Sequence, residues 1–292
     1  MKRRMIAMLM CSVMLLLCGC DSGPQKYKRI SFERQVLGDS IKSIDQNAAV
    51  INNAKESFPT QVPVYEIKTR VISDQECQQM MDNLGMPSNP YDFEHSGNSL
   101  YINLAGMLST TRGYFDMTQE ELETLAWEVF RKIPFIEGEY EYYGIRGENT
   151  ISDSDGEHIT RVLVSFYPIL DGARVTGDNR CDMWFDGSGL VAIRISLFDF
   201  EKTGEMNMIS LADAEPRIKT PDDLSIDDAV KEVDILQVKR VKLLLINQYS
   251  RGCTILQPVY NFIGTATSKN GEQGEFKSKV IAIPDEMTYE EE

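Results

Sequence analysis

The sequence predicts an α+β fold in which antiparallel sheets are each covered by short amphipathic helices. Segments rich in branched and aromatic residues recur along the chain, separated by turn signals such as Asp186-Gly187-Ser188-Gly189. Three stretches begin with Ser or Thr followed three residues later by an acidic residue, which is typical of a helix N-cap. Tight turns join antiparallel strands and cannot make the crossovers of a parallel sheet, so a doubly wound α/β fold is not expected.

Three short helices are expected, each with one apolar stripe at the spacing of a helix. The first begins at Ser73 and carries Cys77, Met80, Met81 and Leu84. The second begins at Thr118 and carries Leu122, Leu125, Ala126 and Val129. The third begins at Ser225 and carries Ile226, Ala229, Val230 and Val233. A short helix with a single stripe needs a surface to pack on, and we expect that surface to be a sheet.

Strands are expected wherever branched and aromatic residues lie between turn signals. The hairpin turns are Asp186-Gly187-Ser188-Gly189 and Lys269-Asn270-Gly271, and Asp171-Gly172 follows another strand directly. A solvated hairpin tip is expected near Asp155 and Gly156. The predicted strands cover residues 159–169, 181–185, 190–197, 241–249, 257–267 and 275–283.

The N-terminus has the pattern of an export signal. Lys2, Arg3 and Arg4 precede an uncharged apolar run over residues 5–17, which is shorter than the roughly 20 residues that cross a bilayer. The sequence that follows, Leu17-Cys18-Gly19-Cys20, resembles the lipobox of bacterial lipoproteins. This resemblance implies cleavage before Cys20 and acyl chains, such as palmitate, on a diacylglyceryl group at its sulfur. We therefore expect a lipoprotein at the extracytoplasmic face of the cell membrane, with membrane lipid as one partner.

Four regions are predicted from composition and pattern. Residues 1–19 are the signal peptide, and residues 20–60 are a lipid-anchored polar tether. Residues 61–212 form an N-terminal α+β lobe, and residues 213–292 form a C-terminal α+β lobe. Pro63-Val64-Tyr65 recurs as Pro258-Val259-Tyr260, which is either a chance match or a sign that the lobes are related.

The charge of the chain argues against two classes of partner. The formal net charge is −15, and it becomes −18 once the three cations of the signal peptide are removed. Nucleic acids and anionic headgroups are bound through Lys and Arg, so neither is expected as the main partner. An excess of carboxylates suits docking onto a basic partner protein or peptide.

No catalytic or metal-binding motif is found in the mature sequence. His95 and His158 have no ligand partner at metal-site spacing and no nucleophile motif nearby. The acidic residues around Gly156 fail as an EF-hand loop because Ile151 occupies the first ligand position. Three cysteines remain after the lipobox, and a buried free thiol is the expected state of Cys77. We expect no cofactor, no metal and no catalytic residue, so the chain is not predicted to be an enzyme.

One acidic and aromatic segment is a candidate binding strip. Glu137, Glu139 and Glu141 alternate along a predicted strand and would share a face, with Tyr140 and Tyr142 between and beside them. Such a strip could bind carbohydrate or peptide. The alternative is an exposed sheet edge that is protected from aggregation by its charges.

Two stretches resemble known bacterial modules in style. Residues 161–194 are predicted to form a strand, then the segment Asp171-Gly172-Ala173-Arg174-Val175, then the hairpin around Asp186-Gly187. This succession is similar to PepSY-like modules. The helix-on-sheet pattern over residues 60–285 resembles the YycH/YycI-like regulators of Gram-positive bacteria. That resemblance implies restraint of a membrane histidine kinase from outside the cell. Those regulators have a transmembrane helix where this chain has a lipobox, so no functional residue is carried over.

Together these patterns predict a lipid-anchored extracytoplasmic binding or regulatory protein that modulates a membrane sensor or envelope protein through its folded ectodomain. One alternative is an envelope hydrolase that uses paired carboxylates about 5 to 9 Å apart. The other is a solute-binding lipoprotein of an importer.

Overall fold

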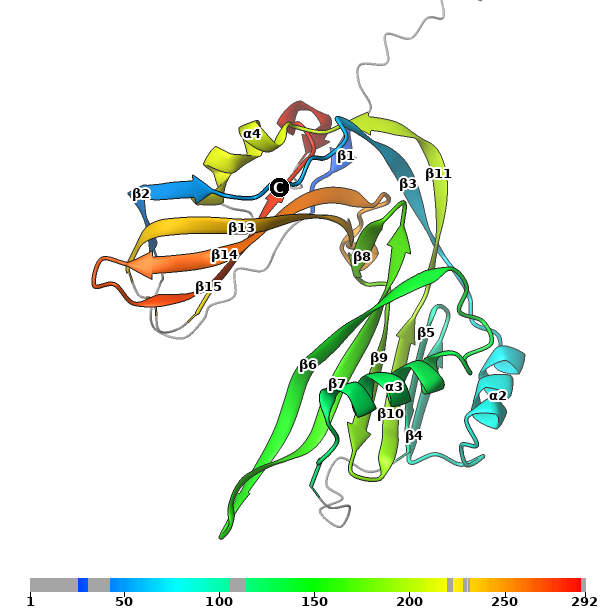
Figure 1. Ribbon diagram of the computed structural model, residues 1–292. Coiled ribbons are helices and arrows are strands. Elements are labelled where there is room, and N and C mark those ends of the chain that lie inside the picture. Colours follow the sequence, from blue (N-terminus) through cyan, green and yellow to red (C-terminus); the bar gives the residue numbers. More distant parts are fainter. Residues whose placement is uncertain are drawn as a thin grey trace, which may run out of the picture.

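The computed structural model describes residues 26–30, 43–104, 114–219, 223–227, 230 and 232–289. The predicted signal peptide and Cys20 lie outside these residues. Within them the protein consists mainly of strands, and most strand pairs are antiparallel, which confirms a mixed, predominantly antiparallel fold. Figure 1 shows two lobes set at an angle and joined through β8 (Ala173–Gly177). We name them the β7 lobe and the β13 lobe after their central strands.

The β7 lobe is a sheet in which β7 pairs with β6 on one side and with β9 and β8 on the other. The sheet continues from β9 through β10 and β5 to β4. The predicted hairpins at Gly156 and at residues 186–189 are both present. The strands are β4 (Asp92–Ser96), β5 (Ser99–Asn103), β6 (Glu139–Asp153), β7 (Gly156–Leu170), β9 (Arg180–Asp186) and β10 (Gly189–Ser196).

Two of the predicted helices lie in this lobe, α2 (Asp74–Asn83) and α3 (Gln119–Phe130). Both begin at the expected capping box. The Ser73 hydroxyl accepts from the Glu76 amide at 3.2 Å, and the Glu76 carboxylate accepts from the Ser73 amide at 2.7 Å. Helix α3 packs on β7, because the Phe130 ring stacks on Phe166 with centroids 4.2 Å apart.

The β13 lobe contains the predicted hairpin at Lys269-Asn270-Gly271, which is extended on both sides by further strands. Strand β13 (Glu232–Asn247) pairs with β14 (Gln257–Ser268), which pairs with β15 (Gln273–Ile281). The short helices α4 (Leu211–Ala214) and η1 (Glu215–Lys219) bury Ala214 and Ile218 in the core of this lobe. Figure 1 shows α4 over one face of the sheet.

The predicted helix at Ser225 is wrong. Ser225 lies in strand β12 (Asp223–Ile226), which pairs with β15 at the edge of the sheet. Pairing with β15 buries Ile226, and this contact between distant segments outweighs the local capping pattern. Strand β13 also starts nine residues before the predicted residue 241, at Glu232.

Part of the predicted tether is also a strand. Strand β2 (Ser43–Asn52) runs parallel to β13, although we assigned residues 20–60 to a polar tether. Its apolar residues Ile44 and Val50 pack against the core of the β13 lobe, and Ala48 is buried. Parallel pairing with a strand far along the chain leaves no local turn signal, so the sequence did not reveal it.

Two features connect the lobes. Strands β3 (Gln61–Thr69) and β11 (Phe198–Asn207) form an antiparallel ribbon. Strand β8 makes the strands of both lobes one continuous sheet, because it pairs with β7 and, in parallel, with residues 244–247 of β13. Gly177 closes this junction at a φ of 103°, where an added Cβ would lie 1.9 Å from the Asn247 carbonyl oxygen. Only glycine fits such a position.

The remaining elements are small. Strand β1 (Tyr27–Lys28) pairs in parallel with β16 (Thr288–Tyr289), and two short 3₁₀ turns, η2 (Tyr249–Arg251) and η3 (Asp285–Met287), complete the β13 lobe. In the described part of the chain, every helix is too short or too polar to span a bilayer.

Candidate functional site

A cavity of about 720 Å³ lies where the two lobes meet. Its walls come from β3, the start of β6, the turn between β7 and β8, and residues 242–245 of β13. Apolar side chains such as Phe58, Ile169 and Leu243 line it beside charged ones, among them Glu139 and Lys242. A mostly apolar cavity with a few polar groups is the usual form of a ligand site, and its volume suits a small molecule or a short peptide.

Arg174 is the best-buried charged group of this cavity. Its side chain is 9% exposed, and its Nη1 donates to the Glu141 carboxylate at 3.1 Å. The guanidinium lies over the ring of Tyr143, 4.5 Å from the centroid, and 5.8 Å from that of Tyr167. The Nε is buried, and no described residue accepts a hydrogen bond from it. A buried donor without an acceptor is rare in proteins and calls for an explanation.

A second polar pair, Tyr65 and Asp171, also lines the cavity. The Tyr65 hydroxyl donates to the Asp171 carboxylate at 2.6 Å. Burial, and then the hydrogen bond to Asp171, raise the pKa of Tyr65 to about 12. Asp171 lies in the predicted Asp171-Gly172 turn and has a left-handed φ of 47°. This turn places the carboxylate of Asp171 next to β3, far away in sequence.

The predicted binding strip is divided between two faces of β6. Glu139, Tyr140 and Glu141 line the cavity, and Glu137 lies just before β6 in an exposed position. The tyrosine rings, however, turn towards α3. Tyr140 lies 5.0 Å from the Phe130 ring, and Tyr142 lies 5.5 Å from the Phe166 ring. Burial raises the pKa of Tyr142 to about 12. The glutamates and tyrosines therefore do not form one continuous surface.

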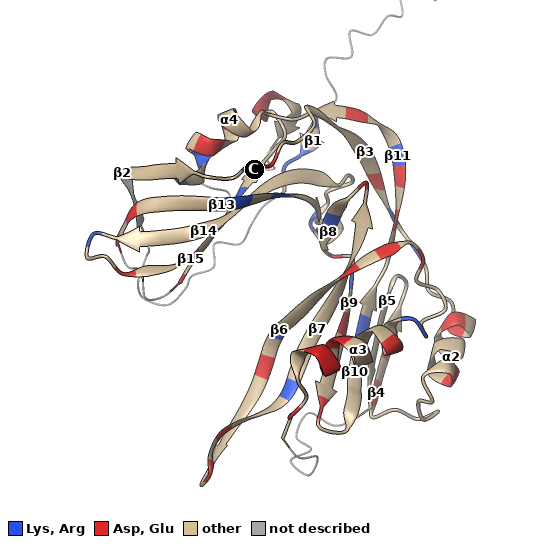
Figure 2. Cartoon of the chain, viewed as in Figure 1, with Lys and Arg blue, Asp and Glu red and all other residues tan. Residues whose placement is uncertain are grey.

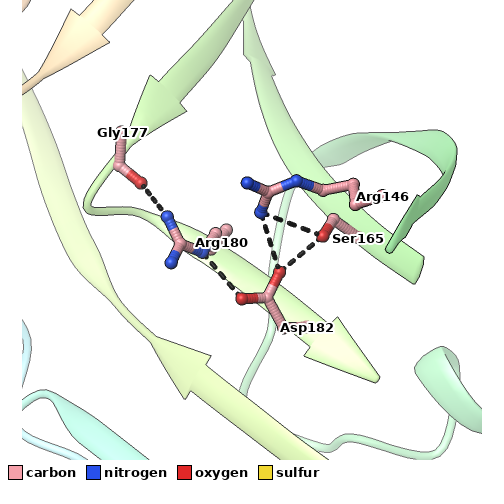
Figure 3. Close-up of polar contacts among 5 residues, drawn as sticks. All are labelled: Arg146, Ser165, Gly177, Arg180 and Asp182. Atoms are coloured by element: carbon pink, nitrogen blue, oxygen red, sulfur yellow. Dashed lines mark hydrogen bonds and ion pairs between the residues drawn. The ribbon is translucent and has the colours of Figure 1, made fainter. Parts of the chain in front are cut away.

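Arg146 of β6 and Arg180 of β9 form an arginine cluster around Asp182 and Ser165 (Figure 3). The Asp182 carboxylate, only 3% exposed, accepts from Arg180 Nε at 2.7 Å and from Ser165 Oγ at 2.5 Å. Arg146 Nη1 lies 3.5 Å from the same carboxylate. Arg146 also lies over the Tyr167 ring, at 6.0 Å, which connects this cluster to Arg174.

The histidines and cysteines of the folded part have structural contacts. His95 Nε2 lies 2.7 Å from the Ile72 carbonyl oxygen, and its Nδ1 lies 3.2 Å from Asp74. His158 stacks on Tyr114 with centroids 3.9 Å apart. Cys77, Cys181 and Cys253 are buried and form no disulfide, and burial raises the pKa of Cys77 to about 11. Within the described ranges, no group of His, Cys, Asp and Glu side chains is arranged to hold a metal ion.

Arg174, Tyr65 and Lys242 are site residues that the sequence did not reveal. They lie on three strands that local patterns do not connect, and Arg174 carried no signal beyond its place after a turn. A charged residue inside an otherwise apolar strand next to a turn is the one hint that the sequence offered.

Comparisons with known proteins leave the family open. No protein-family profile matches the sequence, and no curated protein matches it. Among solved structures, the chain is similar to the C-terminal domain of YpeB from Bacillus megaterium. The sequences are 13% identical, and the match covers 72% of this chain and 99% of that one. With a TM-score of 0.34, this likeness is too distant to imply a shared activity.

Proposed function

We propose that this protein is a lipid-anchored extracytoplasmic regulator that binds part of a membrane sensor or envelope protein in the cavity between its lobes. The observation that carries this proposal is the buried Arg174, whose Nε has no acceptor among the described residues and whose side chain lines the cavity. A site that is largely preformed and leaves one buried donor unused is typical of ligand binding.

The distribution of charge supports a binding role for this region. Figure 2 shows Lys and Arg on β13 and β8 around the junction, whereas Asp and Glu lie along α3 and α2. The protein is acidic overall, and the cavity lining brings Arg174 and Lys242 together with Glu139, Glu141 and Asp171, so it offers a partner charges of both signs. Clustered arginines stacked on aromatic rings are frequent in the energetic centre of protein interfaces.

The alternative of an envelope hydrolase has one observation in its favour. Glu139, Glu141 and Asp171 all line the same cavity. Glu141 is held by Arg174, and Asp171 accepts a hydrogen bond from Tyr65, so both carboxylates already have structural partners. Incubating the protein with purified peptidoglycan decides between the two. Soluble fragments that disappear with Glu141→Gln and Asp171→Asn would favour the hydrolase.

Chemical crosslinking in intact cells, followed by mass spectrometry, tests the proposal. The wild-type chain should yield crosslinks to a membrane or envelope protein, with the crosslinked peptides near the junction. Cys20→Ser is the matched control, because it removes the predicted lipid site and leaves the folded part unchanged. It should lose labelled palmitate and most of the crosslinks. A wild-type protein that yields no envelope partner would contradict the proposal.

A further inference from the structure

We infer that the ligand of this cavity is an extended peptide that pairs with an open edge of β13 and ends in a carboxylate bound by Arg174. The inference rests on the proposed function and names the chemical class of the bound segment. Two observations carry it, one on the backbone of β13 and one on the side chain of Arg174.

Strand β13 has a gap in its pairing at the cavity. One edge of the strand is covered by β14. On the other edge, β2 pairs as far as Val238, and β8 begins to pair at Leu244. Between them, residues 239–243 have no described strand beside them on this edge. Figure 1 shows β2 and β8 near opposite ends of β13. An unpaired strand edge is a template for another extended chain, and many peptide-binding domains use it in this way.

The gap lies beside the cavity and has room for a short peptide. Lys242 and Leu243 belong to the open segment and also line the cavity. At about 3.3 Å per residue, a segment of this length accommodates roughly four or five residues of an added strand. The apolar side chains Leu170 and Leu243 line the cavity and pack on the same apolar cluster, so they favour a peptide with apolar side chains on one face.

Arg174 stands at the end of this gap. In the pairing of β8 with β13, Arg174 is opposite Leu244, the first residue after the open segment. A peptide lying along the gap would therefore end against Arg174. The guanidinium is held in place by Tyr143 and by Glu141, which accepts from Nη1, and no described residue accepts a hydrogen bond from Nη2. A carboxylate supplies such an acceptor and matches the planar guanidinium.

The surrounding charges favour a single carboxylate over a polyanion. Lys242 adds a second cation to the cavity, but Glu139, Glu141 and Asp171 lie there too. A ligand with several negative charges would be repelled by these carboxylates, whereas one terminal carboxylate can reach Arg174. The site therefore fits the C-terminus of a peptide better than a phosphate-rich polymer.

Calorimetry with two synthetic peptides tests the inference on the full mature chain. The probes are Val-Thr-Val-Thr-Leu with a free C-terminal carboxylate and the same peptide as a C-terminal amide. The acid should bind at least about tenfold more tightly than the amide, because a charge-assisted hydrogen bond to Arg174 is lost. Arg174→Lys should reduce the affinity for the acid to about that for the amide.

Arg194→Lys is the matched control. Arg194 also stacks on aromatic rings, 5.1 Å from Tyr101 and 5.7 Å from Trp184, but it is not part of the cavity wall. It should leave both affinities unchanged. Because Arg174→Lys could disturb folding, Lys242→Gln serves as a second variant, and it should weaken binding of the acid more than binding of the amide.

Two results would overturn the inference: equal affinity for the acid and the amide, or no binding of either peptide. Failure of the proposed function looks different. If crosslinking recovers an envelope partner at the junction while neither peptide binds, the peptide inference alone is wrong. If the acid binds selectively while crosslinking recovers no envelope partner, the regulatory role is wrong and the peptide site stands.

Discussion

Replacing both Arg146 and Arg180 by alanine should destabilise the protein by about 3 to 5 kcal/mol, because the Asp182 carboxylate would stay buried without a counter-charge. The burial of the three groups is unequal. The Asp182 side chain is 3% exposed, whereas Arg146 and Arg180 are 32% and 33% exposed. Water can therefore hydrate the arginines but cannot reach the carboxylate.

Because the carboxylate is more deeply buried than the arginines, removing its charge should restore part of the stability that the double variant loses. Adding Asp182→Asn to the double variant removes the buried charge and keeps an oxygen that accepts from Ser165, which donates at 2.5 Å in the wild type. About 2 kcal/mol should return, since a buried charged group without partners costs more than a neutral amide that is hydrogen-bonded. The stacking of Arg146 on Tyr167 is not restored, so recovery should be incomplete.

Urea unfolding of the wild type, the double variant and the triple variant measures these differences as free energies of unfolding. Asp182→Asn in the wild-type background is the control, and it should destabilise, because there the carboxylate has its arginine partners. A triple variant no more stable than the double variant would show that the buried charge is not what the arginines stabilise.

Three further predictions concern the junction, the thiols and a tyrosine. Gly177→Ala should destabilise by about 3 kcal/mol or more, because its Cβ would collide with the Asn247 carbonyl and force β8 away from β13; a small change in the unfolding midpoint would contradict this. In a chain whose lipobox cysteines are replaced, the buried Cys77, Cys181 and Cys253 should react with a thiol reagent only after unfolding, and fast labelling of the native state would argue against their burial. Because the pKa of Tyr65 is raised from 10.0 to about 12, its contribution to the free energy of unfolding is complete below pH 10 and is lost as the pH rises towards 12. Tyr65→Phe should reduce this loss of stability at high pH. A variant whose free energy of unfolding depends on pH as that of the wild type does would contradict this prediction.

The elements predicted correctly are those with local signals. The capping boxes at Ser73 and Thr118 are formed as expected, since each depends on residues three positions apart. The hairpins at Gly189 and Gly271 follow turn signals in the same way. Pairing between distant segments could not be predicted, and β2, β12 and the early start of β13 were missed for this reason.

The candidate site was predictable only in part. The glutamates of β6 were singled out because they alternate along a strand, and two of them line the cavity. Tyr140 and Tyr142 lie between and beside the glutamates in sequence, and the alternation of a strand turns their rings to the opposite face, against α3. Arg174 and Lys242 both line the cavity because β8 pairs with β13. No local sequence pattern predicts this pairing between distant strands.

Site-specific photo-crosslinking in intact cells tests the central claim most directly. A photoreactive residue at Gln61, an exposed position on the cavity wall, is compared with one at Glu128, an exposed position on α3. The account predicts a crosslink to an envelope protein from position 61, its loss when Arg174→Lys is added, and none from position 128. Equal crosslinking from both positions, or crosslinking from position 128 alone, would contradict a binding site between the lobes.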